Sequence, residues 1–147
     1  MMLQYDDATQ VSLREFCLDH DLDITKNYDK EDRRPDQFHF HTTLFFSEAE
    51  CTHPLADGEF DIGLILTIPD HYEMLGENGD ILTLCLKPNL ELNALRTTFN
   101  RNWGLKDSWP TYKPHITLSY SHPSKILPEM FPPTDLLGTR LKITTIK

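Results

Sequence analysis

Apolar residues recur with a helical period in two stretches of the chain. In the first, between residues 8 and 20, the i, i+3, i+4, i+7 spacing of one buried helix face is occupied by Leu13, Phe16, Cys17 and His20. Asp7, with Gln10 three residues later, has the spacing of a variant N-terminal capping box. The pattern predicts a helix over 8–20.

The second helical stretch follows Pro88. Asn89 belongs to the residue types that cap helix N-termini, and Gly104 to those that end helices. Between them, an apolar stripe is formed by Leu92, Leu95, Phe99 and Trp103. We expect a helix that runs to about residue 103.

The remaining apolar segments have the length and composition of strands. They cover residues 1–5, 60–69, 81–87 and 138–146, together with short segments that begin at residues 41 and 115. Polar or Pro-rich connectors separate them at 26–37, 75–79 and 123–133. In chain order the elements form two β-α-β-β units. This order predicts an α+β fold in a single domain, 1–147, with lobes of approximately 1–70 and 71–147.

The segments that begin at His41 and His115 repeat one pattern. His41-Thr42-Thr43-Leu44-Phe45-Phe46-Ser47 aligns with His115-Ile116-Thr117-Leu118-Ser119-Tyr120-Ser121, and the His, second Thr, Leu and final Ser positions are identical. Because strand side chains alternate between faces, His41 and Thr43 share one face, and so do His115 and Thr117. The opposite face of each strand is largely apolar. Pairing of the units about a pseudo-two-fold axis, with antiparallel sheets on either side, would bring both polar faces to one central cleft.

Two imidazoles and two hydroxyls suit the cleavage of a phosphodiester. The ordinary pKa of imidazole is near ~6.5, so a neutral and a protonated histidine can coexist close to pH 7 and serve as base and acid. A threonine hydroxyl can donate to a non-bridging phosphate oxygen and stabilise the charge that develops there. The residues expected to be catalytic are therefore His41, Thr43, His115 and Thr117.

Composition narrows the classes of partner. The chain has 14 Lys+Arg against 23 Asp+Glu, a formal net charge of −9, which disfavours duplex DNA but leaves room for a small anionic ligand in a local site. The longest apolar stretch, near 62–68, is far shorter than the ~20 residues of a membrane span. Three cysteines without a CxxC pair suggest reduced thiols, and no secretory leader is recognisable. We expect a cytoplasmic monomer.

The motifs His41-Thr42-Thr43-Leu44 and His115-Ile116-Thr117-Leu118 resemble the signature of the 2H phosphoesterase superfamily, two H-x-[ST] motifs each followed by an apolar residue. This resemblance implies a bilobal fold and cleavage of phosphodiesters without a metal or another cofactor. Within the superfamily, residues 112–120 are most similar to the phage anti-CBASS nucleases. That likeness implies a cyclic oligonucleotide substrate, a 2′-OH nucleophile, and evasion of bacterial immunity in the host cytoplasm.

Other functions stay open from the sequence. One is an RNA-end 2′,3′-cyclic phosphodiesterase of the 2′,5′-RNA ligase type, and another is a nucleotide-binding sponge without catalysis. A third is a zinc hydrolase that uses His39, His41 and His115, since zinc readily accepts imidazole. We expect no metal, because no cysteine or carboxylate is placed to complete that set.

Three residues near the second motif are candidates for binding substrate. Trp109 and Tyr112 could stack on a nucleobase, or pack beneath the strand instead. Lys113 shares the face of His115 by alternation and could contact phosphate, or it could be an ordinary solvated lysine. Arg33 and Arg34 lie among acidic residues, and a solvated loop is their simplest interpretation.

Overall fold

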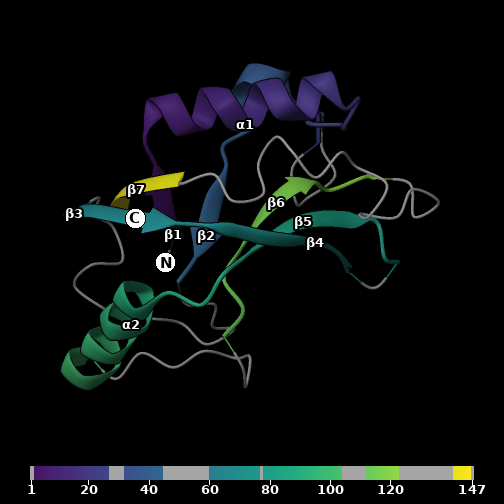
Figure 1. The fold of residues 1–147 in the computed structure, drawn as a ribbon. Helices are drawn as coiled ribbons and strands as arrows, with labels where there is room; N and C mark the ends of the chain where they lie inside the picture. The colour runs from purple at the N-terminus through teal and green to yellow at the C-terminus, as the bar shows by residue number, and fades with distance from the viewer. Residues whose placement is uncertain are drawn as a thin grey trace.

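The computed structural model describes residues 2–26, 32–44, 60–76, 78–103, 112–122 and 141–146. Within these ranges the elements follow the order β1 (Met2–Tyr5), α1 (Asp7–Asp19), the 3-10 turn η1 (Pro35–Gln37), β2 (His41–Thr43), β3 (Phe60–Thr67), β4 (Pro69–Leu75), β5 (Ile81–Leu86), α2 (Leu90–Trp103), β6 (His115–Ser119) and β7 (Leu141–Ile146). The fold is α+β, as the sequence predicts (Figure 1). No helix in these ranges is long and apolar enough to cross a membrane.

The strands of the described residues form one seven-stranded sheet in the order β3-β7-β1-β2-β6-β5-β4, and each of their pairings is antiparallel. The halves of the chain meet at β2 and β6, where Thr42 pairs with Ile116. The sequence predicts separate sheets for the two units, whereas the β2–β6 pair joins them into a continuous one.

Two features of the sheet differ from the sequence prediction. The segment predicted as a single strand over 60–69 ends at Thr67, and a further strand, β4, begins at Pro69. Proline cannot donate to a ladder and is tolerated at the first residue of an edge strand, which is its position here. In addition, β7 lies between β1 and β3, so the last strand expected in the second unit completes the sheet of the first.

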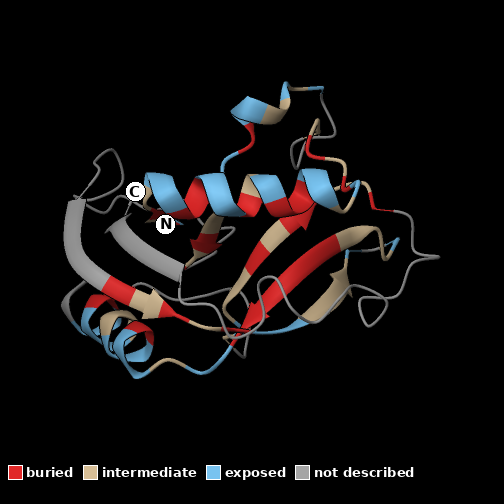
Figure 2. Cartoon of the chain, turned by 45° about the horizontal axis from the view of Figure 1, so that its top comes forward, coloured by how far each residue is buried: buried red, intermediate tan, exposed pale blue. Residues whose placement is uncertain are grey.

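Helix α1 covers the sheet with the face that its periodicity predicts. Leu13, Phe16 and Cys17 are buried, and Figure 2 shows the helix buried toward the strands and exposed on its outer side. The N-terminal cap is Asp6, not Asp7: the Asp6 carboxylate accepts a hydrogen bond from the Thr9 amide at 2.8 Å. The residue that caps a helix has an extended backbone. Asp6 has this conformation, whereas Asp7 is the first residue of the helix and has helical backbone angles.

Helix α2 also begins as the sequence predicts. The Asn89 side chain accepts hydrogen bonds from the amides of Glu91 and Leu92, and Leu92 and Phe99 are buried in the same core as the residues of α1. Leu95 is partly buried against that core. The Trp103 side chain and Gly104 lie outside the described residues. In the view of Figure 1, α1 runs above the strands and α2 lies below them.

Candidate active site

The two H-x-T motifs lie on neighbouring central strands. His41 and Thr43 of β2 are half-buried, while Thr42 between them is fully buried. In β6, His115 and Thr117 are half-buried and Ile116 is fully buried. The alternation predicted from the sequence is therefore present in both strands.

The register between β2 and β6 brings the four motif residues together. Because Thr42 is the partner of Ile116 in an antiparallel pair, the register places His41 across from Thr117 and Thr43 across from His115. All four residues lie on the sheet face opposite the buried Thr42 and Ile116. Each histidine thus faces a threonine of the other repeat, with opposed residues in a ladder about 4.5–5.5 Å apart.

Buried polar contacts fix the position of β2. The hydroxyls of Tyr5 and Thr42 are hydrogen-bonded at 2.7 Å, and both side chains are buried. Gln10 of α1 makes two hydrogen bonds to the backbone of Phe40: its amide nitrogen donates to the carbonyl at 2.7 Å, and its oxygen accepts from the amide at 3.0 Å. These contacts hold the strand in register immediately before His41.

Both motif histidines are oriented by the same type of backbone contact. Nδ1 of His115 lies 2.8 Å from the carbonyl oxygen of Lys113, and Nδ1 of His41 lies 3.4 Å from that of His39. A carbonyl can only accept, so Nδ1 carries the proton in each ring. When the ring is neutral, Nε2 is therefore the nitrogen with a free lone pair.

His41 has an environment that favours its neutral form. Burial lowers the pKa of the imidazole below its ordinary value of 6.5, and the neighbouring His115, the N-terminus and His39 add to the effect. The carbonyl of His39 acts in the opposite direction without reversing the shift. This shift favours the unprotonated imidazole of His41 at neutral pH.

Tyr112 connects the segment before β6 to β2. Its hydroxyl donates to the carbonyl oxygen of Thr43 at 3.0 Å, and the guanidinium of Arg96 lies 3.9 Å from its ring centroid. Arg96 also donates to the carbonyl of Leu44 at 2.6 Å. The sequence does not single out Arg96, although a charged residue four positions after Leu92 within the apolar stripe of α2 is a recognisable signal.

The other predicted binding residues have different surroundings. Lys113 is exposed, and its carbonyl orients His115. Trp109 lies outside the described residues.

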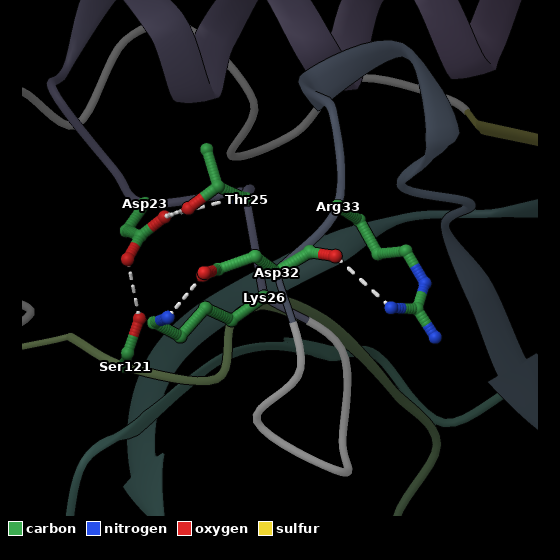
Figure 3. Close-up of polar contacts among 6 residues, drawn as sticks. All are labelled: Asp23, Thr25, Lys26, Asp32, Arg33 and Ser121. Carbon is green, nitrogen blue, oxygen red and sulfur yellow. Dashed lines mark hydrogen bonds and ion pairs between the residues drawn. The ribbon is translucent and has the colours of Figure 1, made fainter.

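The connector after α1 is anchored at the end of β6, as Figure 3 shows. The Asp23 carboxylate accepts hydrogen bonds from the Thr25 amide at 2.9 Å and from the Ser121 hydroxyl at 2.7 Å. Burial opposes ionisation of Asp23, but the hydrogen bonds from Thr25 and Ser121 outweigh it and lower the pKa of the carboxyl group. Lys26 pairs with Asp32 across the connector.

A cluster able to hold a metal lies on the same sheet face, on the two strands beyond β6, namely β5 and β4. The ligand atoms of His71, Glu73 and Cys85 are within 4.8 Å of one another. The sequence suggests His39, His41 and His115 as an alternative set of zinc ligands. Among the described residues, the group close enough to share a metal ion is instead His71, Glu73 and Cys85. The sequence does not reveal it because β4 is not predicted.

The structure defines the chain as an α+β protein with paired H-x-T residues at the centre of an antiparallel sheet. A family model described as Anti-CBASS protein Acb1 matches residues 10–137, and the chain belongs to this family. Membership confirms the anti-CBASS resemblance and assigns the chain a role in evading cyclic oligonucleotide immunity. No curated protein matches the chain.

Proposed function

We propose that this protein is a phosphodiesterase that cleaves cyclic oligonucleotide messengers with two histidines and without a metal. The observation that carries the proposal is the shared sheet face of His41, Thr43, His115 and Thr117, with Nδ1 of each imidazole facing a backbone carbonyl. This arrangement leaves two Nε2 atoms and two hydroxyls for one phosphate group. The substrate class follows from the anti-CBASS family.

The environment of His41 supports an assignment of the two histidine roles. His41, whose pKa is lowered by burial, is the base: its Nε2 takes the proton of a ribose 2′-OH as that oxygen attacks phosphorus. His115 is the acid and gives its Nε2 proton to the oxygen that leaves as the old ester bond breaks. For a 3′,5′ linkage the products are a 2′,3′-cyclic phosphate end and a free 5′-hydroxyl.

The threonines stabilise the transition state. Thr43 and Thr117 each lie across the strand pair from a catalytic histidine. In the proposed mechanism their hydroxyls donate to the non-bridging phosphate oxygens, where negative charge increases during transfer. The exposed ammonium of Lys113, two residues before His115, adds a positive charge beside the phosphate.

The sheet also supports the 2H phosphoesterase assignment. The order β1-α1-β2 recurs as β5-α2-β6, and the two repeats meet at the β2–β6 pair that carries the motifs. We infer from this a pseudo-two-fold arrangement in which each repeat contributes one histidine and one threonine. The bilobal form of the fold is part of the same proposal.

Single substitutions of the histidines test the proposal. His41→Ala and His115→Ala should each lower kcat/KM for a cyclic oligonucleotide by at least about 10²-fold, the lower range of a general acid or base contribution. His39→Ala is the matched control, an exposed imidazole two positions before His41 that should change kcat/KM by less than tenfold. Products are measured by chromatography, and circular dichroism checks the fold. Near-normal turnover in either motif variant would refute the acid–base assignment.

The same assay separates the other candidate functions. Activity lost in chelator and restored by zinc, together with inactivation by His39→Ala, would favour the zinc hydrolase. A cyclic oligonucleotide that binds but is recovered intact would indicate a sponge. Preference for linear 2′,3′-cyclic phosphate ends would indicate an RNA-end enzyme.

A further inference from the structure

The sheet face that carries the H-x-T motifs continues across β5 and β4. In the register, His115 pairs with Cys85, and Cys85 pairs with His71. The next row joins Thr117, Thr83 and Glu73 in the same way. The row alternation of antiparallel strands therefore places His71, Glu73 and Cys85 on the same face as the four motif residues.

The three side chains form a compact donor set. Their ligand atoms all lie within 4.8 Å of one another, and the Cys85 thiol donates to the Glu73 carboxylate at 3.4 Å. His71 is exposed, Glu73 is half-buried and Cys85 is buried. An ion can therefore reach the cluster from solvent on the side of His71, while the Cys85 side is buried in the protein.

The chemistry of this set matches zinc. Zinc binds thiolate, imidazole and carboxylate, and sites with three protein ligands keep a fourth position for water. Soft thiolate combined with imidazole disfavours magnesium and calcium, which prefer sites made of oxygen ligands.

A further contact points to a metal ligand. The carboxylate of Asp70 accepts a hydrogen bond from Nδ1 of His71 at 2.9 Å. A carboxylate on one ring nitrogen is the usual arrangement behind a histidine that binds zinc through its other nitrogen, since it fixes the tautomer and the ring orientation.

We propose that His71, Glu73 and Cys85 bind a zinc ion, with Asp70 as the residue that positions His71. On binding, the Cys85 thiol loses its proton to solvent and sulfur coordinates the ion, so the hydrogen bond from the thiol to Glu73 is replaced by two metal bonds. The fourth position holds water. The site is separate from the proposed phosphodiesterase residues, although Cys85 is on β5, next to the strand of His115.

Cobalt substitution tests the site in the full-length protein. Cobalt(II) added to the metal-free protein should bind in an equimolar amount and give a near-ultraviolet sulfur-to-cobalt charge-transfer band. Zinc should abolish the band by displacing cobalt. Cys85→Ser should eliminate the band, while Cys51→Ser and Cys17→Ser should retain it.

Cys85 is buried, so Cys85→Ser could impair folding, and substitutions of the more accessible His71 and Glu73 provide a second test. Asp70→Asn should weaken zinc binding by ~10–100-fold, the usual cost of losing the carboxylate that is hydrogen-bonded to a metal-binding histidine. His71→Ala and Glu73→Gln each remove a proposed ligand and should weaken zinc binding by more than that. Affinity is measured by competition with a chromophoric chelator. A band that persists in Cys85→Ser, no saturable binding, or binding lost in His39→Ala but not in His71→Ala would each overturn the proposal.

The experiment also distinguishes the metal site from the phosphodiesterase. His41→Ala and His115→Ala should bind cobalt as the unsubstituted protein does, whatever their activity. Absence of the band with normal phosphodiesterase activity would remove only the metal site. A normal band with no cleavage by the unsubstituted protein would remove only the proposed function.

Discussion

At the residue scale, a backbone carbonyl two positions earlier fixes the tautomer of each motif histidine. Lys113 provides it for His115, and His39 provides it for His41. The carbonyl is supplied by the chain itself, so no additional side chain is needed to orient either ring. A short H-x-T motif can therefore present a correctly oriented Nε2 atom, because the carbonyl two positions earlier holds Nδ1 of the same ring.

The lowered pKa of His41 predicts how stability depends on pH. Because the folded-state pKa lies below the ordinary 6.5, the unfolded chain binds more protons as the pH falls. The contribution of His41 to the free energy of unfolding is therefore fully present above about pH 6.5 and decreases as the pH falls through the folded-state pKa. Urea denaturation between about pH 7 and pH 5 should show a steeper loss of stability in the unsubstituted protein than in His41→Gln.

His39→Gln provides the control for this measurement. Its side chain is exposed, so the pH dependence should stay close to that of the unsubstituted protein. Equal slopes for His41→Gln and the unsubstituted protein would contradict the environment described for His41.

Residue roles could be predicted from the sequence to different extents. The period-two alternation places His41, Thr43, His115 and Thr117 on half-buried faces, as the structure shows, because one face of each strand must pack in the core. The surroundings of Tyr112 could not be predicted. They depend on Arg96 and Thr43, which come from other elements and are distant in the sequence.

At the scale of the element, the start of α2 depends on one side chain. Asn89 accepts hydrogen bonds from the amides of Glu91 and Leu92, and its amide nitrogen donates to the carbonyl of Leu66 at 2.8 Å. Asn89 therefore caps the helix and also ties it to β3.

Asn89→Ala should destabilise the protein by about 0.5–2 kcal/mol, the usual cost of losing an N-terminal cap. Asn89→Asp should lose less, because its carboxylate still accepts from the helix amides and is favoured by the helix dipole, although it can no longer donate to Leu66. Chemical denaturation measures both. Equal destabilisation by the two substitutions would mean that the bond to Leu66, not the cap, dominates.

Tyr112 ties the motif strands together, and its hydroxyl can be tested separately from its ring. Tyr112→Phe removes only the hydrogen bond to the Thr43 carbonyl, a net loss of about 0.5–1.5 kcal/mol. If that bond positions Thr43 for the transition state, kcat should fall by up to about tenfold with little change in KM. Steady-state kinetics on a cyclic oligonucleotide provide the measurement.

Tyr112→Leu distinguishes positioning from contact with a base. A ring that stacks on a nucleobase would be retained in Tyr112→Phe and lost in Tyr112→Leu, so KM would rise only in the latter. That result, with an unchanged kcat in Tyr112→Phe, would reassign Tyr112 from positioning to substrate binding.

At the scale of the whole molecule, the elements were more predictable than their pairing. Helices α1 and α2 follow from local periodicity, and the strands carrying the motifs follow from the repeat. The positions of β4 and β7 do not follow, because strand neighbours are chosen by contacts between distant segments. The cluster of His71, Glu73 and Cys85 was missed for the same reason, since it requires the β4–β5 pair.

The place of β7 has a consequence for how the protein assembles. β7 is the last strand in chain order, yet it is interior to the sheet, with β1, the first strand, on one side and β3 on the other. The ladder around β1 therefore stays open until residues 141–146 have been synthesised. Before β7 can pair with β1, the chain must bring together residues 2–5 and 141–146, which are far apart in the sequence. Contacts between such distant segments are typical of slow-folding topologies. Until then, β1 and β3 each present an unpaired edge to other nascent chains.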